Sequence, residues 1–145
     1  MGLQEDLRTR LEAFDPKIQG TEDSWKRKEG GGGKTLAFAN GEIIEKGGVN
    51  FSDVRGGTLP PTATQGRPGL EGAPFRAMGV SVVIHPDNPY LPTSHANVRY
   101  FEATPKGEEP VWWFGGGFDL TPYYPVHEDV VFWHEQAKEV CDAYG

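Results

Sequence analysis

The chain has 145 residues and only one cysteine, Cys141. A single cysteine excludes an intramolecular disulfide and a cysteine-rich zinc module. No apolar run approaches the roughly 18 residues that a membrane-spanning helix needs, and the N-terminal segment lacks the apolar core of a secretion signal. These absences predict a soluble protein of the cytoplasm; a mitochondrial or plastid protein would need a transit peptide that is missing here.

Positive charge is also scarce, because the chain has 14 Lys and Arg residues but 21 Asp and Glu residues, which gives a formal net charge of −7. An acidic surface repels nucleic acid and anionic membranes, so neither is an expected partner. Glycine and proline are abundant instead, at 20 and 12 residues. This composition indicates a turn-rich domain rather than a helical bundle, and an aromatic content of 12% argues against disorder.

The first half of the sequence predicts a helix, a hairpin and a loop. Residues 3–14 form the expected amphipathic helix, which Pro16 ends. Its apolar residues recur at helical spacing; they are Leu3, Leu7, Leu11 and Phe14. Asn40-Gly41 favours a two-residue turn between strands at 35–39 and 42–46. The Pro/Gly-rich residues 57–74 are expected to form an exposed loop or lid.

The second half predicts three strands and a helix. The strands are expected at 75–85, 95–103 and 111–116, with the last broken by the three glycines that begin at Gly115. The helix is expected from about Glu128 to the end of the sequence. Its apolar stripe consists of Val130, Trp133, Ala137, Val140 and Tyr144. Successive strands with helices near the two ends predict one α+β domain, over residues 1–145, built on a largely antiparallel sheet.

The glycine run 30–33, followed by Lys34-Thr35, suggests a phosphate-binding loop. We exclude that site, because Lys28 occupies the position where the motif needs its first glycine and no buried strand precedes the run. A flexible turn is the favoured interpretation. A backbone that a flat ligand approaches closely is the alternative.

Alternation along two strands predicts a polar patch. Successive side chains of a strand point to opposite faces, so His95, Asn97 and Arg99 share one face of their strand, and Ser81 and His85 share one face of the preceding strand. If the two strands pair as a hairpin, these groups converge. Such a set suits a carboxylate ligand, because arginine offers a bidentate fork. A solvated sheet face has the same alternation, so both interpretations stay open.

Four histidines and one aspartate are further candidates. His85, His95 and His134 are three side chains able to bind a divalent metal. The alternative is that these histidines have a structural role, with their ring nitrogens hydrogen-bonded inside the protein. His127 precedes a helix and is expected at the surface. Asp119 follows three glycines among aromatic residues. Its carboxylate either contacts a large planar substrate or hydrogen-bonds to the backbone of its own turn.

Long strings of this sequence resemble one enzyme family. In chain order they are DSWKRKEGGGGKT, EKGGVNFSDVRGGTLP, GVSVVIHPDNPYLPTSHANVRYF and WWFGGGFDLTPYY. They are similar to the oxygen-dependent coproporphyrinogen III oxidases of haem biosynthesis, and the resemblance covers nearly all of residues 20–145. It implies a flat antiparallel sheet flanked by helices. It also implies oxidative decarboxylation of two propionates of coproporphyrinogen III to vinyl groups by dioxygen, which gives protoporphyrinogen IX.

The resemblance also implies roles for individual residues. Arg99 is expected to hold a propionate, with Ser81, Asn97 and Val98 as further substrate contacts. His95 is the implied proton donor. Asp119 is expected to engage the pyrrole N–H groups, as an electrostatic anchor rather than a base, because an ordinary carboxylate is too weak a base for so weak an acid.

The implied metal ligands are His85, His95 and His134, with manganese as the metal in bacterial members, and no organic cofactor is expected. Family enzymes are homodimers and are longer than this chain, which matches the N-terminal half of the family pattern. We therefore expect the chain alone to be poorly soluble or inactive. Two other functions stay open: a non-catalytic tetrapyrrole-binding module, and an unrelated histidine-based metal oxygenase.

Overall fold

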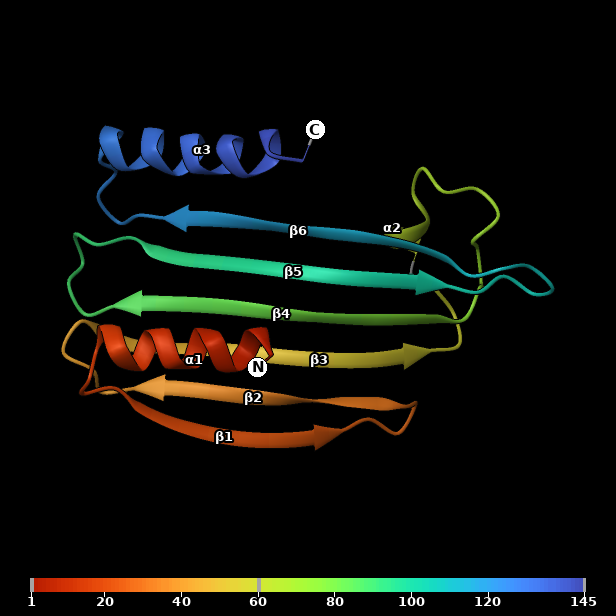
Figure 1. Cartoon of the computed structure of the whole chain (residues 1–145), viewed down its shortest axis with the longest axis horizontal. Coiled ribbons are helices and arrows are strands. Elements are labelled where there is room, and N and C mark those ends of the chain that lie inside the picture. The colour runs from red at the N-terminus through yellow and green to blue at the C-terminus, as the bar shows by residue number, and fades with distance from the viewer. Residues whose placement is uncertain (1, 60, 145) are drawn as a thin grey trace.

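The computed structural model describes residues 2–59 and 61–144, which form one open sheet with helices beside it (Figure 1). Each strand pairs antiparallel with the strand before it in the chain, in the order β1 to β6. This connectivity needs only short turns. The helices are α1 (Leu3–Phe14), α2 (Pro61–Thr64) and α3 (His127–Asp142). The strands are β1 (Gln19–Lys26), β2 (Gly31–Ala39), β3 (Ile44–Gly56), β4 (Phe75–Pro86), β5 (Thr93–Ala103) and β6 (Val111–Thr121).

This architecture confirms the predicted α+β class and the antiparallel sheet. The helix predicted at 3–14 and the strands predicted at 75–85 and 95–103 are also confirmed to within two residues. Among the described residues, no helix combines the length and the apolar character needed to cross a membrane.

Helix α1 covers one face of the sheet and completes its core. Leu7 and Leu11 pack against Leu36, Phe38 and Val49, which are at most 2% exposed. Burial of these side chains is the main stabilising contribution on this face. We call it the α1 face, and the opposite face the polar face.

The predicted helix stripes are only partly buried. Leu3 and Phe14, at the ends of the α1 stripe, are 48% and 61% exposed. Val130 and Val140 of α3, and Tyr144 just after it, are exposed as well. The stripes are buried only in part, because Leu7 and Leu11 make the core contacts of α1 and α3 packs mainly against β6.

The hairpin at Asn40-Gly41 exists, but its turn is longer than two residues and β3 begins at Ile44. Asn40 has the expected positive φ of 59°. The reason for the longer turn is Asp15, which is 1% exposed and accepts backbone hydrogen bonds from Glu42, Ile43 and Ile44 at 2.8–3.1 Å. These bonds lower the pKa of Asp15 to about 2, although burial of the carboxylate by itself would raise it.

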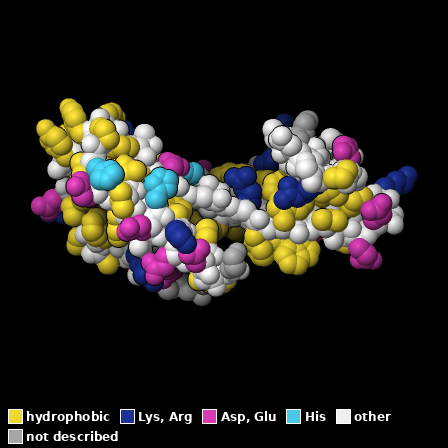
Figure 2. Space-filling model, turned by 90° about the horizontal axis from the view of Figure 1, so that it is seen from above, with side chains coloured by type: hydrophobic (Ala, Val, Ile, Leu, Met, Phe, Trp, Pro, Cys, Tyr) yellow, Lys and Arg dark blue, Asp and Glu magenta, His cyan; other side chains and the backbone are white. Residues whose placement is uncertain are grey.

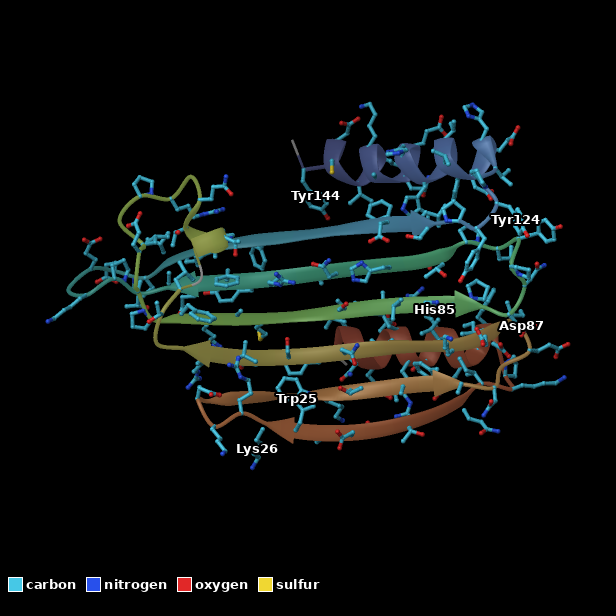
Figure 3. All side chains as sticks on the ribbon, turned by 180° about the vertical axis from the view of Figure 1, so that it is seen from behind. Trp25, Lys26, His85, Asp87, Tyr124 and Tyr144 are labelled. Atoms are coloured by element: carbon cyan, nitrogen blue, oxygen red, sulfur yellow. The ribbon has the colours of Figure 1, made fainter. Side chains whose placement is uncertain are left out.

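Strand β1 and the glycine half of β2 were not predicted. Three glycines of the run, Gly31–Gly33, lie in β2 between β1 and β3 rather than in a flexible turn, and only Gly30 belongs to the turn before it. The flat group that approaches it is Trp25 of β1, since a Cβ at Gly33 would overlap the Trp25 ring and the Phe51 carbonyl oxygen. Figure 3 shows Trp25 on the polar face, with α1 behind the sheet.

Strand β6 continues through Gly115–Gly117 to Thr121, so the predicted break is wrong. Its glycines pair with Arg99, Val98 and Asn97 of β5 and keep the ladder continuous. Backbone pairing, which glycine does not impair, overrides the low strand propensity of the tract.

The loop at 57–74 is anchored rather than wholly exposed. Leu59, Leu70 and Ala73 are at most 5% exposed and cluster with Ala103 at the end of β5. The short helix α2 lies within this loop. Apolar anchors of this kind hold the loop against the end of the sheet and fix which residues it presents to the polar face.

Asp15→Asn is expected to lower the urea midpoint of unfolding at pH 7, because an amide nitrogen would face backbone N–H donors. The pKa of Asp15 is lower in the folded chain than in the unfolded one. Its contribution to stability is therefore complete above about pH 4 and is lost as pH falls toward 2. Asp23→Asn, at an exposed carboxylate of β1, is the control and should leave the midpoint unchanged. An equal midpoint for Asp15→Asn and wild type would contradict this role.

Gly33→Ala is expected to destabilise the chain and to shift tryptophan emission to longer wavelength, because the methyl group displaces the Trp25 ring. Thermal unfolding and fluorescence spectra measure the two effects. Gly117→Ala is the matched control, since a Cβ there meets nothing within 4 Å. Equal effects of the two substitutions would show that Trp25 does not occupy the space above Gly33.

Candidate functional site

The register places the predicted polar residues together on the polar face. Ser81 of β4 lies opposite Asn97 of β5, and Gly79 lies opposite Arg99. Residues directly opposite in an antiparallel pair project to the same face. Asp119 of β6 lies opposite His95 and joins the same side. The predicted convergence is therefore confirmed as geometry, and β6 contributes the carboxylate.

Three of these side chains form a hydrogen-bonded row. His95 Nδ1 lies 2.8 Å from Asp119 Oδ2, and His95 Nε2 lies 3.2 Å from Ser81 Oγ. An ionised carboxylate only accepts hydrogen bonds, so Nδ1 carries the hydrogen. In the neutral imidazole, Nε2 then accepts from the Ser81 hydroxyl. Asp119 thereby fixes the tautomer and the ring orientation of His95.

This row remains accessible to solvent. The side chain of His95 is 35% exposed and that of Asp119 is 59% exposed. Only Oδ2 of Asp119 is engaged by His95, and Oδ1 has no partner among the described residues. One carboxylate oxygen is therefore available to a donor from outside the chain.

A cavity of about 520 Å³ lies beside the row on the polar face. Figure 2 shows the molecule hollowed between two raised ends, with basic and histidine side chains at the margins of the hollow. The size of the cavity suits part of a large organic molecule. It is lined by Thr62, Ala63, Arg67, Asn97, Arg99, Phe101, Trp113, Gly115 and Gly116.

Arg99 is an exposed cation of this cavity. Across the described ranges, no carboxylate lies within ion-pair distance of its guanidinium. Arg76 of β4 differs, because its Nε and Nη2 donate to Asp53 at 2.8 and 2.6 Å. Those bonds hold the pKa of Asp53 below its ordinary value. Arg76 is thus already occupied, whereas the fork of Arg99 is free to bind an anionic ligand.

The structure does not group the three predicted metal ligands. His85 interacts with Thr93, His95 lies between Ser81 and Asp119, and His134 of α3 borders a smaller cavity with Asp119. No three His, Cys, Asp or Glu residues within the described ranges form a set that could hold a metal ion. The residues present do not fit a metal in this geometry. The ligand set stays a prediction.

Val98 lies apart from the other predicted contacts. It pairs with Val80 and is 54% exposed on the α1 face, so only its backbone can contribute to the site. Arg67 and Trp113 were not predicted. The available signal for Arg67 was its position as the one basic residue of the loop 57–74, but the burial of that loop is not visible in the sequence.

The chain was compared with models of known protein families. The family model described as coproporphyrinogen III oxidase matches residues 1–145, the whole chain. This match agrees with the strings that suggested the resemblance, two of which lie on β4 to β6 and carry the polar face. The protein therefore belongs to the coproporphyrinogen III oxidase family, whose activity is a step of porphyrin biosynthesis.

Proposed function

We propose that this protein acts as the oxygen-dependent form of coproporphyrinogen oxidase and that its polar face binds coproporphyrinogen III. The observation that carries the proposal is Arg99, whose guanidinium has no ion-pair partner among the described residues and lines the 520 Å³ cavity next to the row Ser81–His95–Asp119. The substrate has four propionates, so its binding requires a cation of this kind. Asn97, which lines the same cavity, adds an amide donor to the carboxylate.

The proposed reaction needs a proton source. Each of the two reacting propionates loses a β-hydrogen and carbon dioxide and becomes a vinyl group, and the electron pair goes to dioxygen. One further proton completes hydrogen peroxide. We assign this proton to His95, whose imidazolium form donates from Nδ1 to Asp119 and presents its Nε2 hydrogen to Ser81 or the substrate.

Asp119 has two roles in this proposal. Oδ2 holds His95 in position, and the free Oδ1 accepts a hydrogen bond from a pyrrole N–H. A nearby carboxylate stabilises positive charge as the electron-rich pyrrole passes electrons to dioxygen. Asp119 is thus an electrostatic anchor, and it need not remove the pyrrole proton.

A homodimeric assembly and a cytoplasmic location are further parts of the proposal that follow from the resemblance. The manganese that the resemblance implies is left out of the proposed reaction, because His85, His95 and His134 form no metal-binding set in the described part of the chain.

A non-catalytic tetrapyrrole-binding module is the second candidate, and the exposure of the site favours it. Asp119 and His95 face solvent, and water access is poorly suited to reactive oxygen intermediates. Binding alone needs no such protection. Protoporphyrin fluorescence after coproporphyrinogen III is added under air separates the two, since the module binds without forming this product.

Arg99→Ala is expected to raise the Kd for coproporphyrin III about tenfold or more, because a charge-assisted bidentate contact to a propionate is lost. Coproporphyrin III is a stable, fluorescent analogue with the same four carboxylates, so titration reports binding without catalysis. Arg76→Ala removes a paired guanidinium on the α1 face and should leave this affinity unchanged. Unaltered binding by Arg99→Ala would refute the proposed site.

Asp119→Asn is expected to abolish any oxidase turnover while the Kd for coproporphyrin III changes less than about threefold. An amide no longer fixes the imidazole, so the ¹⁵N spectrum of His95 should lose its preference for hydrogen on Nδ1. Asp87→Asn, in the exposed turn after β4, is the control. A wild-type His95 spectrum in the variant, or equal losses of binding and turnover, would contradict the anchoring role.

A further inference from the structure

A second guanidinium lines the 520 Å³ cavity from a different part of the chain. Arg99 approaches it from the sheet, on β5, and Arg67 approaches it from the loop that contains α2. Thr62 and Ala63 of the same loop also line the cavity. Two cations therefore reach one space from separate elements.

Stacked rings fix the position of Arg67. Its guanidinium carbon lies 4.3 Å from the centroid of the Trp113 ring, a cation–π geometry. Trp113 in turn stacks on Phe101, with centroids 5.1 Å apart and an interplanar angle of 12°. Burial of Leu59 and Leu70 holds the loop in place. Arg67 is exposed, but its stacking on Trp113 holds the guanidinium at the cavity.

Neither cation of the cavity has an acidic partner among the residues that the structure describes. Within the described part of the chain, no carboxylate lies within ion-pair distance of Arg67 or Arg99. Most other arginines do have one: Arg8, Arg10, Arg27 and Arg76. With a net charge of −7, the chain has acidic residues in excess, so two unpaired guanidiniums around one cavity indicate a site for an anionic ligand.

We propose that Arg67 binds a second carboxylate of the tetrapyrrole, so that the loop 57–74 and β5 each hold a different propionate. The inference rests on the proposed function, in which Arg99 binds the first propionate. It assigns the loop a role in selecting substrates that carry more than one carboxylate. A single carboxylate shared by both guanidiniums, and a purely structural role in covering Trp113, are the alternatives that the experiment must distinguish.

The experiment titrates coproporphyrin III into the full chain at low ionic strength and follows porphyrin fluorescence. Arg67→Ala and Arg67→Met are expected to raise the Kd about threefold to tenfold, and Arg67→Lys less than twofold. Methionine keeps apolar packing over Trp113 without the charge. The increases in Kd should be smaller at high salt, as expected for a charge contact near solvent. Thermal unfolding of each variant checks its fold.

Arg55→Ala is the matched control, because Arg55 is also an exposed arginine with no ion pair to any described residue, but it lines a separate cavity. Its Kd should equal that of wild type. The double variant combines Arg67→Ala with Arg99→Ala. If the guanidiniums hold separate carboxylates, its fold increase in Kd should be the product of the increases in the two single variants. A double loss no greater than that of Arg99→Ala alone would show a shared carboxylate and overturn the proposal.

The remaining outcomes separate this inference from the function on which it rests. Wild-type affinity in Arg67→Met, with weak binding only in Arg67→Ala, would show a packing role for Arg67. Unchanged binding in every Arg67 variant, with Arg99→Ala still weakened, would refute the inference and leave the proposed function intact. Absence of coproporphyrin III binding by wild type, or normal binding by Arg99→Ala, would refute the proposed function and this inference with it.

Discussion

The candidate site depends on the antiparallel register of β4, β5 and β6. Because side chains alternate with period two, a slip of one residue would turn Asn97 and Arg99 toward the α1 face. The α1 face opposes such a slip, since Leu36 and Val49 are buried there beneath the helix and fix which side of each strand faces inward. The buried Asp15 carboxylate fixes the turn between β2 and β3. Apolar packing on one face thereby determines the polar chemistry of the other.

The sequence predicted β4 and β5 well, because long segments of regular side chains make the period of two visible. Strand β1, the glycine half of β2 and the end of β6 could not be predicted in this way. Strand β1 lies at the sheet edge and is exposed at all but one position, so it shows no alternation of apolar side chains. The glycines of β2 and β6 carry no side chain to show alternation, and these segments adopt strand structure because neighbouring strands supply hydrogen bonds on both sides in β2 and on one side in β6. The turn at Asn40-Gly41 was misjudged because its actual geometry depends on Asp15, which is distant in sequence.

The polar face was predictable to a similar extent. Alternation brought His95, Asn97 and Arg99 to one side, and the register confirms it. The pairing of Asp119 with His95 required the length of β6, which the expected break at its glycines concealed. Arg67 was not predictable at all, since its position follows from burial of Leu70 and from stacking on Trp113. Loop residues reach a site through tertiary contacts that no local pattern encodes.

The glycines of β6 support the interpretation of the polar face as a binding surface. Glycine in a strand interior costs conformational entropy and offers no side chain to pack. Neither Gly115 nor Gly117 has a positive φ, and a Cβ at either position would meet nothing within 4 Å. The chain itself therefore gives no steric reason for glycine there. Both residues lie on the polar face beside Asn97 and Arg99, so a broad ligand held close to the β6 backbone accounts for the missing side chains, and a tetrapyrrole is large enough to cover both positions.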